Sequence, residues 1–309
     1  MLNIDPDNSC CYCQKTEFQD REIFSEIEKI PDGLDRTSIR KVKIKTCKEC
    51  RSVFVNELSG GKVSVKGQSI SFTASKETLE KSDYLDPYSS SLVPKAYKKL
   101  WANSDALDFG CGGGYFTRYL SGFVGSVEAA DLDKEAVEFV SKSLKIKTHY
   151  WDISNIPAGK FNLITLIGVF EHFDKPSQAI KSLNSSLKKG GFLLIALPNL
   201  NSFTRYITRF SKHDWDMFLE PGHISFPSKK IFLKNLEKEG LDLDYYFTTN
   251  NIIRGKIPFL PYRNRDLERL VFRICSKSRI LYYLYHLLFK LFDLFRLGDI
   301  SVYILKKSN

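Results

Sequence analysis

The sequence predicts an α/β fold in which parallel strands alternate with helices, and three observations in residues 105–131 indicate it. An apolar run ends at Asp108, a loop of alternating glycines follows, and a helix-like stretch leads into a second apolar run that stops at Asp131. Strand, tight turn, helix and strand in this order form a βαβ unit. The glycines allow positive φ, so the backbone of the turn can approach a ligand closely.

The glycine loop predicts a site for a nucleoside-bearing cofactor. It reads Asp-x-Gly-x-Gly-x-Gly over residues 108–114, whereas dinucleotide folds usually show Gly-x-Gly-x-x-Gly and seat a pyrophosphate on a helix N-terminus. An acid before the loop repels a pyrophosphate but suits a cationic or zwitterionic ligand. Asp131, at the end of the second strand, is placed to hold a ribose diol. A purely structural turn in another α/β protein is the alternative interpretation.

These residues resemble the first motif of the class I S-adenosylmethionine-dependent methyltransferases, and later segments resemble the rest of that family in the same order. Residues 146–152 look like a strand that ends at Asp152, and 161–176 like the fourth strand and its loop. Residues 187–199 look like a helix end, a Gly-Gly turn and the fifth strand. Residues 223–241 look like the helix before the sixth strand, and 300–307 like a final edge strand. The resemblance covers residues 75–309 and implies a Rossmann-like sheet of seven strands, mostly parallel with an antiparallel last strand.

The resemblance implies S-adenosylmethionine as the cofactor and assigns its contacts by position. The glycine loop would lie against the methionine and ribose, Asp131 would hold the ribose hydroxyls, and Asp152 would accept from the adenine amino group. The expected cofactor-binding residues are Asp108, Gly110, Cys111, Gly112, Gly114, Asp131, Leu132, Asp152, Ile153 and Gly168.

Three residues are candidates for the chemistry of transfer. Methyl transfer is an in-line displacement that needs donor and acceptor held in line and, for a hydroxyl or carbon acid, a base. His172 follows the fourth strand, and His223 begins the next helical region; an imidazole titrates near neutral pH, which suits a base. A structural hydrogen bond is the alternative for each histidine. Glu171 could orient a histidine, touch the acceptor or help hold a divalent ion.

A cysteine module precedes this region. Five of the seven cysteines lie in the first fifty residues, and four of them form two Cys-x-x-Cys pairs, Cys10 with Cys13 and Cys47 with Cys50. Two such pairs predict a tetrahedral Zn²⁺ site with strands at 40–46 and 51–57. Four thiolates leave no position for a catalytic water, so the zinc would be structural. A redox pair is the alternative. The module resembles the N-terminal ribbon of some bacterial sugar and surface-polysaccharide methyltransferases.

The chain divides by pattern into a zinc-ribbon-like module at 1–57, a linker and cofactor-capping helix at 58–103, and a methyltransferase domain at 104–309. A helix is expected at 86–101; the family resemblance implies that it caps the cofactor pocket, and an ordinary packing helix is the alternative. Within the last segment, 252–297 forms a helical amphipathic insertion, whose apolar stripe includes Leu291 and Phe295. Residues 279–296 could contact a membrane surface peripherally, or pack in the core or in a homodimer interface.

Composition and motifs also bear on the acceptor. The net charge of +10 favours anionic partners, and so a phosphate-bearing small molecule or glycan. Nucleic acid is disfavoured, because amino-methylating enzymes of that class resemble one another in an Asn/Asp-Pro-Pro-aromatic turn where this chain reads GVFEH. RNA methylation and a non-catalytic scaffold that binds the cofactor are the alternatives. No signal pattern is visible, which predicts a cytoplasmic protein, with peripheral contact at the inner face of the membrane as a further option.

Overall fold

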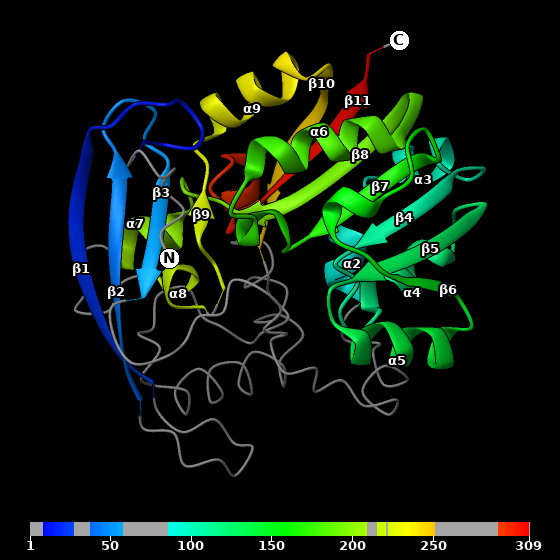
Figure 1. Cartoon of the computed structure of the whole chain (residues 1–309), viewed down its shortest axis with the longest axis horizontal. Coiled ribbons are helices and arrows are strands. Elements are labelled where there is room, and N and C mark those ends of the chain that lie inside the picture. Colours follow the sequence, from blue (N-terminus) through cyan, green and yellow to red (C-terminus); the bar gives the residue numbers. More distant parts are fainter. Residues whose placement is uncertain are drawn as a thin grey trace. The chain divides into compact units, whose positions relative to one another are not determined.

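The computed structural model describes residues 9–27, 38–57, 86–208, 215–220, 222–250 and 290–308. The chain forms two compact units (Figure 1). One, which we call the cysteine unit, comprises 1–63, 198–228 and 248–300, and the other, the sheet unit, comprises 64–197, 229–247 and 301–309. The units interleave along the chain, whereas the sequence suggested consecutive segments at 1–57, 58–103 and 104–309.

The sheet unit is built on seven strands in the order β10-β11-β8-β7-β4-β5-β6. The pairs β4–β5, β4–β7, β5–β6 and β7–β8 are parallel, and the sheet contains one antiparallel strand. This confirms the predicted fold class. The strands are β4 (Asp105–Phe109), β5 (Ser126–Asp131), β6 (Lys147–Tyr150), β7 (Phe161–Ile167), β8 (Leu187–Pro198), β10 (Leu241–Thr249) and β11 (Ile300–Lys307).

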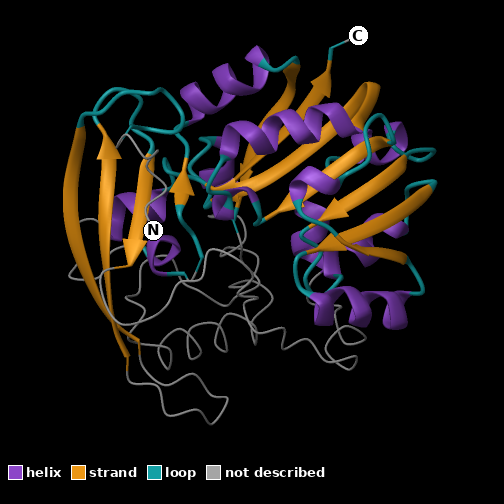
Figure 2. Ribbon diagram, viewed as in Figure 1, coloured by secondary structure: helices purple, strands orange, loops and turns teal. Residues whose placement is uncertain are grey.

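Helices pack on both faces of this sheet (Figure 2). On one face, Trp101 at the end of α3 lies 5.9 Å from Phe192 of β8, between ring centroids. On the other, Phe232 of α9 lies 5.1 Å from Tyr303 of β11. The helices are α2 (Asp86–Leu92), α3 (Lys95–Leu100), α4 (Tyr115–Ser121), α5 (Lys134–Leu144), α6 (Pro176–Ser186) and α9 (Lys229–Lys238), with 3-10 turns η2 (Ile153–Asn155) and η3 (Phe170–His172).

The single helix expected at 86–101 is wrong, because the segment forms two short helices, α2 and α3. Pro94 lies between them with an extended ψ of 146° and caps α3. A proline has no backbone N–H and disfavours helical backbone in the residue before it, so the first helix ends before Val93.

The strands predicted at 187–199 and 300–307 are present as β8 and β11, but the structure differs from the prediction in detail. Strand β8 begins at Leu187 directly after α6, and the Gly-Gly pair lies inside it as an irregularity: Phe161 pairs with Leu187, but Leu163 pairs with Phe192. Strand β11 is not an edge strand, since it lies between β10 and β8, and its residues 300–305 are all buried. The edge strand next to β11 is β10, and β6 forms the opposite edge.

The cysteine unit contains a four-stranded antiparallel sheet in the order β1-β2-β3-β9. Its strands are β1 (Phe18–Ile27), β2 (Ser38–Cys47), β3 (Val53–Glu57) and β9 (Ser225–Phe226), so the strands expected at 40–46 and 51–57 are confirmed. Two short helices, α7 (Phe203–Thr208) and α8 (Asp216–Leu219), complete the unit. Its core consists of Val42, Ile44, Val53, Val55, Leu200, Trp215, Phe218 and Phe226.

Two sequence predictions lie mainly outside the described residues. These are the linker, since residues 58–85 of the predicted 58–103 segment lie outside, and most of the amphipathic insertion, of which the structure describes only 290–297.

Candidate functional site

The loop between β4 and α4 takes the positive-φ backbone conformation that its glycines predicted. Gly110, Gly112 and Gly114 have φ values of +76°, +46° and +74°. A Cβ at Gly110 would lie 2.3 Å from Cγ2 of Val169, whereas a Cβ at Gly112 would meet nothing within 4 Å. Gly110 is therefore required for packing, and Gly112 leaves open space beside the backbone.

This difference predicts unequal effects of two matched substitutions on stability. We expect Gly110→Ala to lower the free energy of unfolding by about 2–4 kcal/mol, because it adds overpacking against Val169 to the left-handed strain. Gly112→Ala should cost about 1 kcal/mol from strain alone. Urea unfolding of both variants measures the difference, and equal losses would contradict this account of the loop.

Asp108 lies under the loop and is held by two hydroxyl groups. Its Oδ2 accepts from Thr117 Oγ1 at 2.6 Å, and its Oδ1 accepts from Thr165 Oγ1 at 2.8 Å. The residue is 2% exposed, and burial raises the pKa of its carboxyl to about 6. Asp108 therefore ties β4, α4 and β7 together beneath the loop. Sequence reasoning missed Thr165, although a threonine inside the apolar run 161–167 is itself a signal of a buried polar partner.

Asp131 faces the loop from the end of the neighbouring strand β5. Its Oδ2 accepts from the backbone N–H of Gly112 at 2.8 Å, and its Oδ1 accepts from the N–H of Asp133 at 3.0 Å. Burial raises the pKa of this carboxyl as well. Leu132 follows and is exposed. The sequence-predicted acid and the second loop glycine are thus in direct contact.

Cys111 belongs to the loop but its side chain is part of the packing. It is buried with Ala129 and Val140, and burial raises the pKa of its thiol. Its backbone N–H donates to the carbonyl of Ala130 at 3.1 Å. Cys111 would therefore contact a bound cofactor through its backbone and not through its thiol.

The other predicted cofactor residues follow β6 and β7. Asp152 caps η2: its Oδ1 accepts from the N–H and the hydroxyl of Ser154, each at 3.1 Å, and the side chain is exposed. Ile153 is half-buried in the same turn. Gly168 has φ +67° and donates to the carbonyl of Ala196 at 2.9 Å. Since β4, β5, β6 and β7 are parallel, the residues after them share one edge of the sheet, where such folds bind ligands.

Two candidate catalytic residues lie in η3, directly after β7. Glu171 is 1% exposed, and burial raises the pKa of its carboxyl to about 8. His172 is half-buried, and its backbone N–H donates to Val169 at 3.0 Å. At neutral pH, Glu171 is therefore mostly protonated, which suits a hydrogen-bond donor better than a base.

The raised pKa of Glu171 predicts a pH-dependent stability. The group ionises near pH 4.5 when unfolded but near pH 8 when folded, so its stabilising contribution is complete below pH 4.5 and is lost as the pH rises to 8. We expect Glu171→Gln to raise the melting temperature relative to the parent at pH 9 and to change it little at pH 5. Thermal unfolding at both pH values tests this. The exposed neighbour Asp174→Asn is the control, and a variant effect independent of pH would contradict it.

His223 lies in the cysteine unit. Its Nδ1 donates to the carbonyl of Met217 at 2.9 Å, and its ring centroid is 5.9 Å from that of Phe226. The Met217 contact is the structural hydrogen bond that sequence reasoning gave as the alternative. A role of His223 as a base stays a prediction.

The four predicted zinc ligands come together in the cysteine unit. The sulphurs of Cys10 and Cys50 are 3.6 Å apart, those of Cys13 and Cys47 are 3.5 Å apart, and all four lie within 4.8 Å of one another. Four thiolates 2.3 Å from a zinc ion form a tetrahedron with edges of about 3.8 Å, so the arrangement fits the metal. Cys11 is not part of the cluster.

Each cysteine pair is held in a tight turn of the same form. The N–H of Gln14 donates to the carbonyl of Cys10 at 2.8 Å, and the N–H of Arg51 donates to Cys47 at 3.0 Å. Gln14 and Arg51 have φ values of +61° and +64°, which non-glycine residues rarely adopt. Such strain persists where surrounding contacts enforce it. The hydrogen bond from the Cys10 thiol lowers the pKa of Cys50 to about 5.

Comparison with known proteins identifies the domain. A family model described as a methyltransferase domain matches residues 83–246, more than half of the chain. The chain belongs to this family. The matched residues include the glycine loop, Asp131 and η3, and the domain is a class I S-adenosylmethionine-dependent methyltransferase domain.

Two relatives of this chain carry the name ubiquinone biosynthesis O-methyltransferase. The protein from Pelagibacter ubique is 30% identical over 159 residues, which cover 46% of this chain and 66% of the relative. The mitochondrial protein from Candida albicans is 28% identical over 159 residues, which cover 43% and 49% respectively. The chain therefore spans less than two thirds of the length of either relative.

Among solved structures, a chain from a Haloferax volcanii complex with the Trm112 methyltransferase activator is similar in fold. Its TM-score is 0.51 at 12% identity, and the match covers 79% of this chain and all of that chain. Within the described ranges, no helix has the length and apolar character needed to cross a bilayer.

Proposed function

We propose that this methyltransferase transfers a methyl group from S-adenosylmethionine to an oxygen atom of a small-molecule or glycan acceptor. The observation that carries the proposal is the contact between Asp131 and the N–H of Gly112, beside open space at the loop. It fixes a carboxylate where a ribose diol can donate to it. The names of the relatives support oxygen as the atom that is methylated.

The residues around the loop would act mainly by binding and orienting. Bound S-adenosylmethionine supplies an electrophilic methyl group on a sulphonium centre. Asp131 would hold the ribose, Asp152 would accept from the adenine amino group, and the backbone of 110–114 would lie along the methionine. Gly168, which is exposed at the end of β7, leaves room for a ligand next to η3. Proximity and orientation of this kind supply much of the rate gain in a displacement.

The acceptor we favour is a sugar nucleotide or a related glycan intermediate. The net charge of +10 supports an anionic, phosphate-bearing compound. The candidate bases for the proton of the attacking hydroxyl are His172, which follows Glu171 in η3, and His223 of the cysteine unit. The names of the relatives favour a different acceptor class, a precursor in ubiquinone biosynthesis, and this is the competing outcome.

Incubation with labelled S-adenosylmethionine and an acceptor panel tests the proposal. The panel contains nucleotide sugars, phenolic quinone precursors and RNA. Label on a sugar nucleotide supports the favoured acceptor, and label on a phenol keeps the O-methyltransferase proposal but replaces the acceptor. Transfer to RNA alone, or cofactor binding without transfer to any acceptor, would overturn it.

We also propose that Cys10, Cys13, Cys47 and Cys50 hold a structural Zn²⁺. The support is the fit of the four sulphurs to a tetrahedron, with Cys47 and Cys50 at the turn between β2 and β3 and Cys10 and Cys13 in the turn before β1. A closed Cys₄ site contributes folding energy and no catalytic water.

The described end of the insertion supports a proposal of peripheral contact with an anionic lipid surface. Leu294 and Phe295 are 74% and 69% exposed, Leu291 is also exposed, and Lys290 and Arg296 flank them. Apolar side chains between basic ones suit a membrane interface. We expect Leu294→Glu to lower the fraction of protein that floats with phosphatidylglycerol vesicles by more than half. The control is a neutral phosphatidylcholine vesicle, and equal flotation of parent and variant would contradict the proposal.

A homodimer and a cytoplasmic location remain predictions.

A further inference from the structure

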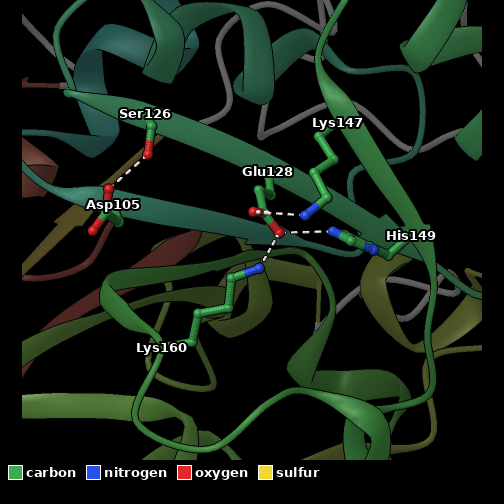
Figure 3. A network of polar contacts seen from close by, with 6 residues as sticks. All are labelled: Asp105, Ser126, Glu128, Lys147, His149 and Lys160. Carbon is green, nitrogen blue, oxygen red and sulfur yellow. Dashed lines mark hydrogen bonds and ion pairs between the residues drawn. The ribbon is translucent and has the colours of Figure 1, made fainter.

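One carboxylate oxygen binds both stems of the loop that carries Asp152 (Figure 3). Nε2 of His149, which precedes the loop in β6, lies 2.7 Å from Oε2 of Glu128. Nζ of Lys160, which follows the loop and precedes β7, lies 2.6 Å from the same oxygen. Glu128 itself projects from the neighbouring strand β5. The segment 151–160 is therefore closed at its base by a single side chain.

The backbone holds the two stems in different ways. Lys160 and Gly159 donate from their N–H groups to the carbonyls of Ser186 and Ser185 at 3.0 and 2.8 Å. The other stem is β6, a strand of four residues at the edge of the sheet that pairs only with β5. Short edge strands have hydrogen bonds on one side and are held weakly. The stem that carries His149 is therefore paired on one side only, and its contact with Glu128 adds a second restraint.

A ring stack connects His149 with the residue that precedes Asp152. The rings of His149 and Trp151 are 3.7 Å apart between centroids, at an interplanar angle of 12°. Trp151 directly precedes Asp152. The orientation of the imidazole therefore constrains the residue next to the exposed carboxylate.

Glu128 is ionised in this setting. Burial would raise the pKa of its carboxyl, but the hydrogen bonds from Lys160 and His149 lower it on balance. An ionised carboxylate between two cationic or polar donors forms stronger hydrogen bonds than a neutral acceptor.

We infer that Glu128 is a positioning residue for recognition of the adenine base, acting through His149 and Trp151 on Asp152. The inference rests on the proposed cofactor site. Adenine offers an amino donor to the Asp152 carboxylate, whereas hypoxanthine places a carbonyl oxygen at the same position. If the Asp152 carboxylate is held in place, it accepts a hydrogen bond from adenine but not from hypoxanthine, and the site prefers adenine. If the carboxylate is displaced, this preference is lost.

Calorimetry with two product analogues tests the inference. The probes are S-adenosylhomocysteine and S-inosylhomocysteine, with the unsubstituted chain and Glu128→Gln. We expect Glu128→Gln to bind the adenosyl compound about tenfold more weakly, since it loses charge-assisted hydrogen bonds at both stems. Affinity for the inosyl compound should change little, so the ratio of the two affinities falls.

The matched control is Lys147→Gln. Lys147, the first residue of β6, lies 3.4 Å from the other oxygen of Glu128, and its side chain is 65% exposed, so it does not share the oxygen that binds His149 and Lys160. It should leave both affinities unchanged. Because His149 and Lys160 act through the same carboxylate, the double variant Glu128→Gln/Lys160→Met should bind no more weakly than Glu128→Gln alone.

Three results would overturn the inference. A Glu128→Gln variant with the parental affinity ratio would show that Asp152 does not depend on Glu128. Equal weakening for both compounds, with a lowered melting temperature, would indicate general loosening of the sheet. If the unsubstituted chain bound neither compound, the proposed cofactor site would fall, and this inference with it.

Discussion

Asp131→Ala is expected to lower the affinity for S-adenosylhomocysteine about a hundredfold. Two ribose hydroxyls would donate to this carboxylate, and each hydrogen bond to a charged group contributes about 1.5–3 kcal/mol, of which desolvation offsets part. The substitution also removes the acceptor for the Gly112 N–H, which lies 2.8 Å from Oδ2. The loop would then lose both its ligand contact and its brace. Isothermal titration calorimetry measures the loss directly.

Asp133→Ala is the matched control for Asp131. Asp133 lies two residues further on, and its carboxylate caps α5 by accepting from the N–H of Glu135 at 2.9 Å. Its removal should cost about 1 kcal/mol of stability, as loss of a helix cap does, and leave the affinity unchanged. If the two alanine variants bound the ligand equally well, Asp131 would have no part in ribose recognition.

The second large effect is expected at the cysteine cluster. Cys47→Ser should abolish stoichiometric zinc binding and unfold the cysteine unit, because structural zinc contributes about 10–16 kcal/mol in small zinc-binding domains. Cys47 is fully buried at the end of β2, and its sulphur is 3.5 Å from that of Cys13. Zinc content by mass spectrometry and thermal unfolding, with and without a chelator, give the two readouts.

Cys11→Ser is the control for this cluster. Cys11 is adjacent to Cys10 in sequence but is not among the four grouped sulphurs. The variant should keep one equivalent of zinc and the parental melting temperature. A parental protein that contains no zinc, or a Cys47→Ser variant that keeps it, would contradict the structural-metal proposal.

The parts of the fold that sequence predicts well are those where one residue type is physically required. Positive φ in a tight turn needs glycine, so the spacing of Gly110, Gly112 and Gly114 predicts the loop. The Cys-x-x-Cys spacing likewise brings two sulphurs together in each turn. The acid at the end of β5 follows from the length of the βαβ unit.

The parts that sequence does not predict depend on partners far apart in the chain. Nothing near Phe54 indicates that β3 pairs with β9 at Ser225, 171 residues later. Strand β11 lies inside the sheet and is buried on both faces. Its short sequence alternates like an edge strand, so the sequence does not predict this interior position. The contacts of Glu128 with His149 and Lys160 cannot be predicted without the register of the sheet. In the sequence, each of these residues is an ordinary polar side chain.

A co-crystal structure with S-adenosylhomocysteine tests the central claim most directly. The account predicts the ribose hydroxyls within hydrogen-bond distance of Asp131, the adenine amino group at Asp152 and the homocysteine along residues 110–114. A loop left empty at saturating ligand, or one that binds a nicotinamide dinucleotide instead, would contradict it.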